Sequence, residues 1–206
     1  MKTLIKIGVL LTVAFLYACT PESGDMNAEK VEAIRIETEE LPELSIYNLP
    51  AKWTNQDGEE IELIDLRGDV VVMVMIYTTC RAACPRLVAD MRNIHKNVPE
   101  ENNKNVKYVL VSIDPEVDTP EMLKAFSIEN QMNDTDQWTF LRGTESDTRE
   151  FAAVLAVSYK QISPIDFSHS NIISVFDQEG VLAHQKEGLG VDSKETIAAI
   201  IELSNN

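Results

Sequence analysis

The stretch VVVMVMIYTTCRAACP, residues 70–85, joins an unbroken apolar run to two cysteines four positions apart. An apolar run of this length that is rich in valine is typical of a buried parallel strand. Pro85 is tolerated only in the first turn of a helix, so we expect a helix to begin close to Cys84. Both thiols should therefore lie where a strand ends and a helix begins. In open α/β sheets, ligands bind at this edge.

The beginning of the chain has the layout of an export signal. Residues 1–6 are basic, and residues 7–17 form an apolar run too short to span a bilayer as a helix. A small residue then precedes Cys19, which resembles a bacterial lipoprotein signal; the alternative is an ordinary secretory signal with an incidental cysteine. We expect a signal peptide at 1–18 with Cys19 as the lipidated N-terminus, and an acidic tether at 19–42.

The charge of the chain narrows the choice of partners. Its 34 acidic and 18 basic residues give a formal net charge of -16. This excess argues against a nucleic-acid partner, which requires a basic surface. It also argues against electrostatic attachment to a membrane and leaves the lipid as the anchor. We therefore expect an extracytoplasmic protein, on the periplasmic side of a membrane, that a lipid holds in place.

Residues 43–206 alternate between strand and helix patterns and are expected to form one domain. The expected strands are 44–49, 60–64, 70–77, 106–113, 138–141, 171–177 and 181–186, and the expected helices are 84–97, 120–129, 145–157 and 194–203. Such alternation implies a partly parallel sheet with helices on both faces. The fold class is α/β and thioredoxin-like: a central mixed sheet, an N-terminal β-hairpin that turns at Asp57-Gly58, and an insert around 115–142.

Three details of this expectation can be compared with a structure. Residues 159–168 show no regular pattern and are expected to be irregular. In the helix at 145–157, the side chains of Phe151, Val154 and Leu155 should face the core. His95, near the end of the helix that follows the cysteines, should be a solvated helix residue.

The spacing of Cys80 and Cys84 permits two kinds of chemistry. If the turn is helical, a rise of about 1.5 Å per residue separates them by roughly 6 Å on one face. That suits a disulfide or two thiolates on one metal. The helix N-terminus and Arg81 should favour the thiolate form of both. A disulfide that closes so small a loop would stabilise little, so the pair is better explained by chemistry than by structure.

A metal would need a further ligand. Two cysteines cannot hold an iron–sulfur cluster alone, and a structural zinc site requires four ligands. Copper(I) accepts two or three, and the most plausible third ligand is a histidine. Of the three histidines, His95 is far along its helix and the direction of His184 in its strand is uncertain. His169 precedes the strand at 171–177, which in a thioredoxin-like sheet lies beside the cysteines.

Three motifs of the domain resemble those of the Sco/SenC family of copper proteins. They are CRAACP at 80–85, VSIDPEVDTP at 111–120 and SHS at 168–170, and the resemblance covers residues 43–203 in matching order. It implies a thioredoxin-like, membrane-anchored protein that faces out of the cytoplasm and binds copper through both cysteines and the late histidine. Members of the family help to assemble the copper A centre of cytochrome c oxidase.

Carried over to this chain, the resemblance makes Cys80, Cys84 and His169 the ligands of Cu(I) or Cu(II). The sequence departs from the family pattern at two places: Arg81 and Ala82 stand where Pro and Asp are common, and Ser168 stands where an acid often precedes the histidine. The ligand residues themselves are all present. The departures concern the tuning of the site and its partner surface.

Three functions remain open on the sequence. The first is a copper chaperone that delivers copper to, or prepares, the copper A site of cytochrome c oxidase or another extracytoplasmic copper protein. The second is an enzyme, a thiol–disulfide oxidoreductase in which Cys80 attacks and Cys84 resolves. The third is a binding module that senses copper or redox state. A redox role does not need His169, and Ser170 and Asn171 stand where such enzymes usually have a cis-proline. Both features favour copper.

Overall fold

The computed structural model describes residues 40–81, 83–133, 136–164 and 166–205 of the chain. The expected signal peptide, its lipidation site Cys19 and most of the expected tether lie outside these ranges. Within them, no helix combines the length and the apolar character that crossing a membrane requires. Residues 41–206 cluster into one unit, which contains all the elements described below.

A seven-stranded mixed sheet forms the centre of this unit, with the strand order β2-β1-β5-β4-β3-β8-β9. The strands are β1 (Lys52–Asn55), β2 (Glu60–Glu62), β3 (Val70–Ile76), β4 (Val106–Ser112), β5 (Trp138–Arg142), β8 (Ile172–Phe176) and β9 (Leu182–Glu187). The pairs β3–β4 and β4–β5 are parallel, and the other pairs in the sheet are antiparallel. The predicted mixed sheet and its antiparallel closing pair are confirmed.

Strand β3 lies in the interior of the sheet, and all seven of its residues are buried. It pairs with β4 on one side and with β8 on the other. A strand that is covered on both faces and paired at both edges has no polar side to present, which explains its continuous run of valine, methionine and isoleucine. The register aligns Val70 with Val106 and Ile76 with Ser112, so both strands end at the same edge of the sheet.

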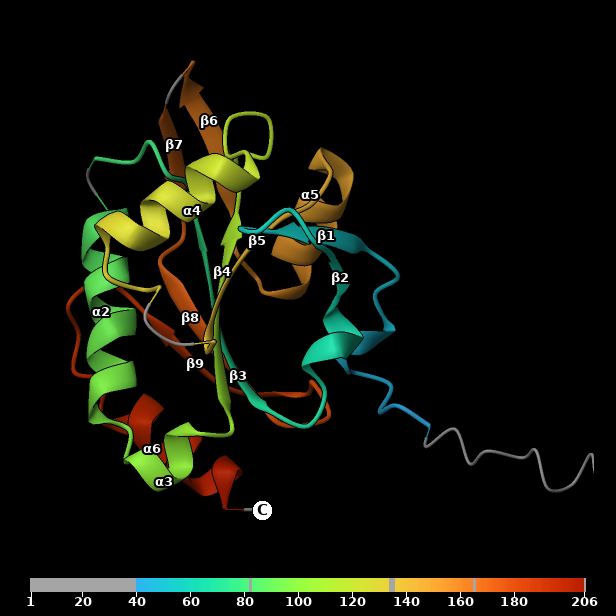
Figure 1. The fold of residues 1–206 in the computed structure, drawn as a ribbon, viewed down its shortest axis with the longest axis vertical. Helices are drawn as coiled ribbons and strands as arrows, with labels where there is room; N and C mark the ends of the chain where they lie inside the picture. The colour runs from blue at the N-terminus through green and yellow to red at the C-terminus, as the bar shows by residue number, and fades with distance from the viewer. Residues whose placement is uncertain (1–39, 82, 134–135, 165, 206) are drawn as a thin grey trace, which may run out of the picture. The chain divides into compact units, whose positions relative to one another are not determined.

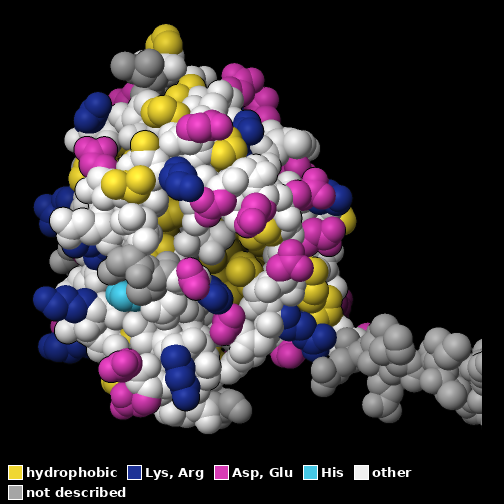
Figure 2. Space-filling view, in the orientation of Figure 1, with side chains coloured by type: hydrophobic (Ala, Val, Ile, Leu, Met, Phe, Trp, Pro, Cys, Tyr) yellow, Lys and Arg dark blue, Asp and Glu magenta, His cyan; other side chains and the backbone are white. Residues whose placement is uncertain are grey.

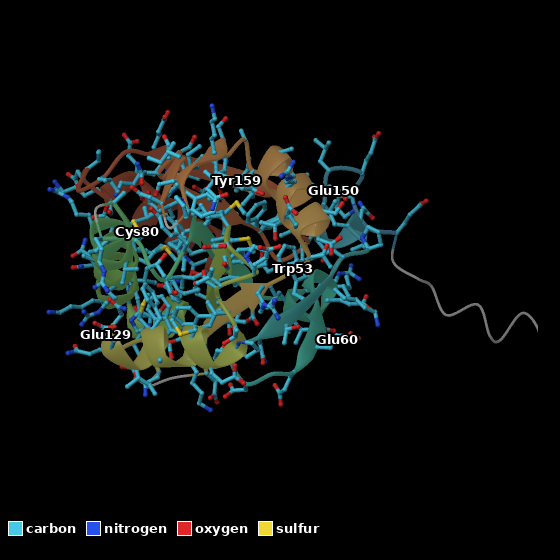
Figure 3. All side chains as sticks on the ribbon, turned by 90° about the horizontal axis from the view of Figure 1, so that it is seen from above. Trp53, Glu60, Cys80, Glu129, Glu150 and Tyr159 are labelled. Atoms are coloured by element: carbon cyan, nitrogen blue, oxygen red, sulfur yellow. The ribbon has the colours of Figure 1, made fainter. Side chains whose placement is uncertain are left out.

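Helices cover both faces of the sheet, as predicted. They are α2 (Cys84–Asn97), α3 (Glu100–Asn103), α4 (Pro120–Glu129), α5 (Glu145–Val154) and α6 (Lys194–Ser204). Figures 1 and 3 show α4 and α5 on opposite sides of the strands. Helix α6 packs against α2, β3 and β8. The Thr119 hydroxyl accepts the Met122 N–H, and this cap sets the start of α4 where the sequence indicates it.

The predicted strand at 44–49 is wrong. Residues Ile46–Asn48 form a 3-10 helix, η1, because the Ser45 hydroxyl accepts the Tyr47 N–H and holds the chain in a turn. The first strand of the hairpin is β1 instead, and its turn at Asp57-Gly58 is as predicted. Gly58 has φ +81°, a conformation that favours glycine. After β2, the chain forms a second 3-10 helix, η2 (Leu63–Leu66), of which only Leu63 and Ile64 had been predicted as strand.

The segment expected to be irregular is also different. There, β6 (Tyr159–Ser163) pairs with β7 (Asp166–His169) as an antiparallel hairpin. The hairpin is a two-stranded sheet of its own, outside the seven-stranded sheet. In Figure 1 it projects at the top, beyond the ends of the central strands. All five residues of β6 are at least partly exposed, so the sequence lacks the apolar alternation by which strands are recognised.

Helix α5 is shorter than predicted, and one of its expected core residues points outward. The helix ends at Val154, and Ala156 then has φ +54°, a left-handed residue that cannot continue a helix. Val154 is 47% exposed, whereas Phe151 is 1% exposed and packs edge-to-face against Trp53 at a ring-centroid distance of 5.3 Å. Leu155 is buried, as predicted.

Replacing Phe151 by Ala is expected to lower the free energy of unfolding by about 3–4 kcal/mol, because the change leaves a cavity beside Trp53. Urea unfolding followed by circular dichroism measures this. The matched control is Val154→Ala in the same helix, for which we expect a change below about 0.5 kcal/mol. Equal losses in the two variants would contradict the orientation of α5 described above.

Candidate metal centre

The two cysteines lie at the edge of the sheet where β3 and β4 both end. Cys80 is in the loop that follows β3, and Cys84 is the first residue of α2, with Pro85 next, as the sequence predicts. Neither cysteine forms a disulfide; Cys80 is 7% exposed and Cys84 is fully buried. Figure 3 shows Cys80 beside α2. Helix α2 begins at the second cysteine, so Cys80 lies before the helix.

The sulfur of Cys80 also caps the helix. The backbone N–H of Cys84 donates a hydrogen bond to Cys80 Sγ, with an N···S distance of 3.3 Å. The residue before the helix, Ala83, has no side chain that can accept such a bond. The first N–H groups of a helix have no acceptor within the helix. The sulfur of Cys80 is the acceptor for one of them. This contact fixes Cys80 Sγ relative to α2 and therefore relative to Cys84.

His169, the last residue of β7, completes the cluster. Its Nε2 is 3.7 Å from Cys84 Sγ, and its Nδ1 is 3.0 Å from the Ser170 carbonyl oxygen. A carbonyl only accepts hydrogen bonds, so Nδ1 carries the proton and Nε2 presents its lone pair toward the sulfurs. Burial lowers the pKa of His169, which keeps the imidazole neutral. The ligand atoms of Cys80, Cys84 and His169 all lie within 4.8 Å of one another.

Burial dominates the protonation of Cys84. It raises the pKa of this thiol, and the neighbouring Cys80 and Asp118 raise it further. The expectation that the helix N-terminus favours the thiolate of both cysteines is therefore wrong for Cys84: desolvation of a fully buried sulfur outweighs the helix dipole. A bound cation reverses this balance by displacing the thiol proton. Two sulfurs and one imidazole nitrogen form a ligand set suited to a soft metal ion.

A protein-family model matches most of this chain. The model of the SCO1/SenC family matches residues 43–204. The chain belongs to the SCO1/SenC family. The SCO1 protein homolog of Bacillus subtilis (strain 168) is 36% identical over 104 residues, and the chain spans about half of that relative: the match covers 50% of this chain and 53% of the homolog. A SCO2-like protein of Rickettsia typhi is 24% identical over 190 residues, which are 87% of each chain.

Solved structures agree with this assignment. A SCO1/SenC family lipoprotein from Bacillus anthracis is 28% identical with a TM-score of 0.68, over 77% of this chain and 95% of that one. BsSco, described as a Sco-family cytochrome c oxidase assembly protein with a disulfide switch, is 27% identical with a TM-score of 0.67, over 77% and 94%. Copper-bound yeast Sco1, at 18% identity and a TM-score of 0.62 over 76% and 87%, shares the fold. The predicted thioredoxin-like fold and the family resemblance are confirmed.

In this SCO1/SenC protein, a buried carboxylate supports the cysteine loop. Asp118 is fully buried and accepts hydrogen bonds from the Thr78 hydroxyl (2.5 Å), the Thr78 N–H (3.2 Å) and the Ser112 hydroxyl (2.6 Å). Burial raises the pKa of Asp118, and these hydrogen bonds oppose the shift. The carboxylate therefore ties the loop after β3 to the end of β4. Asp118 belongs to the VSIDPEVDTP motif, and its place beyond the end of a buried strand is the sequence signal that could have indicated this role.

The two other histidines of the SCO1/SenC chain lie elsewhere. His95 is half-buried, with its ring 5.0 Å from that of Tyr108 and 5.1 Å from that of Trp138, and its Nε2 is 3.1 Å from Gln137 Oε1. The expectation of a solvated histidine is wrong, because the aromatic side chains of β4 and β5 cover it. His184 on β9 is 3.1 Å from the hydroxyl of Thr196 on α6.

Charges are mixed on the surface of this SCO1/SenC protein. On the face shown in Figure 2, acidic and basic side chains are interspersed rather than gathered by sign. Arg81, next to the first cysteine, is exposed. It adds a positive charge to the surface beside a buried cluster, so its influence is on what approaches the site rather than on the packing of the thiols.

Replacing Asp118 by Ala is expected to lower the free energy of unfolding by about 2–4 kcal/mol, because it leaves the half-buried Thr78 donors and the buried Ser112 hydroxyl without their acceptor. Chemical denaturation of the reduced protein measures this. Glu116→Ala, an exposed acid in the same loop, is the control and should change little. A loss below about 1 kcal/mol for Asp118→Ala would show that the carboxylate does not hold the loop.

Proposed function

We propose that this protein binds copper as its cargo through Cys80, Cys84 and His169, and delivers it to, or prepares, the copper A site of cytochrome c oxidase. The observation that carries the proposal is the convergence of two thiol sulfurs and an imidazole nitrogen within 4.8 Å. The copper-bound structures of yeast Sco1 and Arabidopsis thaliana ScoI support the choice of metal. BsSco, described as a member of a family of oxidase assembly proteins, supports the choice of acceptor.

The donor set suits a carrier of copper. Thiolates prefer Cu(I), and imidazole binds both Cu(I) and Cu(II), so three such ligands can retain the ion in either state. His169 is partly exposed and Cys80 is 7% exposed, whereas Cys84 is fully buried. An incoming ligand of an acceptor therefore reaches copper from the side of Cys80 and His169, and Cys84 is the last ligand to release it. This order allows transfer by ligand exchange without a free ion.

The reduced domain is expected to bind about one equivalent of copper and to develop a thiolate-to-Cu(II) absorption band on titration. His169→Ala should weaken Cu(II) binding at least about tenfold, because it removes the imidazole ligand. His184→Gln, a histidine substitution away from the cluster, is the matched control and should bind as the wild type does. Loss of copper from the wild-type protein to a mild chelator would contradict the proposal.

A thiol–disulfide oxidoreductase is the second candidate. Its support is the pair of free thiols with sulfurs within 4.8 Å, together with the disulfide switch described for BsSco. This chemistry uses Cys80 as the attacking thiol and Cys84 as the resolving one, and does not require His169. The His169→Ala variant therefore separates the two functions: it should impair Cu(II) binding and leave the rate of disulfide reduction unchanged. A wild-type protein that reduces disulfides and retains no copper would favour the oxidoreductase.

We further propose that the domain at 43–206 is held at the outer side of a membrane by a lipid on Cys19, after removal of residues 1–18, with 19–42 as an acidic tether. The short apolar run and the small residue before Cys19 support this. So does the related structure from Bacillus anthracis, which is described as a lipoprotein. Anchoring would keep the copper cluster close to a membrane-embedded acceptor.

Cys19→Ser is expected to abolish incorporation of a fatty-acid label and to move the protein from the membrane to the soluble fraction, because one acyl-modified cysteine provides the anchor. Metabolic labelling followed by fractionation measures both effects. The control is Cys80→Ser, which should keep the label and the membrane location. Equal labelling of the Cys19→Ser variant and the wild type would disprove the anchor.

A further inference from the structure

The third ligand of the cluster lies on a different part of the fold from the other two. The cysteines follow β3, at the centre of the seven-stranded sheet, whereas His169 ends the β6–β7 hairpin, which is a separate two-stranded sheet. No strand ladder among the described residues joins the hairpin to the large sheet. Backbone hydrogen bonds between strands therefore do not fix the position of His169 relative to the thiols. Side-chain contacts must help to fix that position.

The side chain of Tyr77 makes such contacts from the end of β3. It is 1% exposed, and its hydroxyl donates to Asp166 Oδ1 with an O···O distance of 2.5 Å. The same oxygen accepts the N–H of Phe167 at 3.2 Å. The Tyr77 ring also meets the rings of Phe167 and His169 edge-on, at centroid distances of 5.2 and 5.9 Å. One side chain three residues before the first cysteine thus contacts three residues of β7.

We propose that Tyr77 is a positioning residue for the metal cluster: its hydroxyl, held by Asp166 and the Phe167 N–H, fixes β7 against the cysteine loop and so sets the distance from His169 to the thiols. We call these two hydrogen bonds the Tyr77 latch. The inference rests on the proposed copper function of Cys80, Cys84 and His169. It assigns to Tyr77 and Asp166 a role in shaping that site without contact with the ion.

The hydrogen bond between the Tyr77 hydroxyl and Asp166 is stronger than one between two neutral groups. A hydroxyl that donates to a carboxylate forms a charge-assisted hydrogen bond, which is shorter and stronger than a neutral one. Asp166 is exposed, so water can solvate the rest of its carboxylate and its charge is not stranded in the interior. The Tyr77 hydroxyl also interacts with Cys80, and the Asp166→Ala variant leaves that interaction in place.

The latch should matter more for Cu(II) than for Cu(I). Two thiolates are a sufficient ligand set for Cu(I), whereas Cu(II) depends more on the imidazole nitrogen. Loosening β7 changes the position of His169 and leaves in place Cys80, in the loop after β3, and Cys84, at the start of α2. The ratio of the two affinities therefore reports the position of the histidine, and a general loss of stability would not change it in this direction.

Tyr77→Phe is the sharpest test, because it removes only the hydroxyl and keeps the ring that packs on Phe167 and His169. In the copper-free protein, the Phe167 amide should exchange with solvent faster than in the wild type. With copper, we expect affinity for Cu(II) to fall about tenfold and affinity for Cu(I) to change less than about threefold. The nitrogen hyperfine pattern of His169 in the Cu(II) spectrum should weaken or broaden.

Two further variants complete the experiment. Asp166→Ala tests the same latch at an exposed residue, where the substitution does not endanger folding. The double variant should bind Cu(II) no more weakly than Tyr77→Phe alone, because either substitution already removes the hydrogen bond between Tyr77 and Asp166. Tyr108→Phe is the matched control. Tyr108 lies on β4, away from the cluster, and its hydroxyl donates to Asn103 Oδ1 at 2.7 Å in the wild type. Its Cu(II)-to-Cu(I) affinity ratio should equal that of the wild type.

The outcomes separate this inference from the function on which it rests. If the wild-type protein binds copper with a nitrogen ligand, but Tyr77→Phe and Asp166→Ala leave both the Phe167 exchange rate and the affinity ratio unchanged, the latch is overturned. If the wild type binds no copper, the proposed function fails. The exchange rate of the Phe167 amide then decides alone whether Tyr77 holds β7, because that measurement needs no metal.

Discussion

The parallel, in-register pairing of β3 with β4 is the constraint on which the rest of the site depends. It brings the ends of two buried strands to one edge of the sheet, so that Thr78 and Ser112 donate to the same carboxylate, that of Asp118. The loop that carries Cys80 is thereby fixed at its base by a strand that no solvent reaches. The start of α2 fixes it at the other end, where the sulfur caps the helix. These two attachments hold the dithiol at the edge of the sheet.

Burial then determines the chemistry of the dithiol. An isolated thiol at a helix N-terminus tends to ionise, but Cys84 is fully buried, and desolvation raises its pKa. The site therefore stores its sulfur as a neutral thiol and keeps a neutral imidazole beside it. Cys84 and His169 then place no net charge in the interior until a cation arrives and displaces the thiol proton. Because burial keeps the Cys84 thiol protonated in the metal-free protein, uptake of a metal ion is coupled to release of that proton.

The sequence predicted the elements whose signals are local and missed those whose signals are distant. The valine run of β3, Pro85 in the first turn of α2 and the Thr119 cap of α4 each define an element within a few residues. The hairpin β6–β7 was not predicted, because the residues of β6 are exposed and lack apolar alternation. The two hydrogen bonds of Tyr77 join residues about ninety positions apart, and a tyrosine after an apolar run gives no sign of its partner. His95 was misjudged for the same reason: its aromatic neighbours lie on strands that the sequence places far away.

The division of the ligands between two parts of the fold is consistent with a carrier. Cys80 and Cys84 belong to the rigid centre, whereas His169 belongs to a hairpin that side-chain contacts attach to it. A protein that only stored a metal would gain from placing all its ligands on one framework, because every fixed donor slows release. A carrier must hold its cargo and later release it, and a donor on a separately attached element can withdraw while the sulfurs still hold the ion. If the cluster carries copper as proposed, the strength of the attachment of β7 to the end of β3 determines how readily the copper leaves.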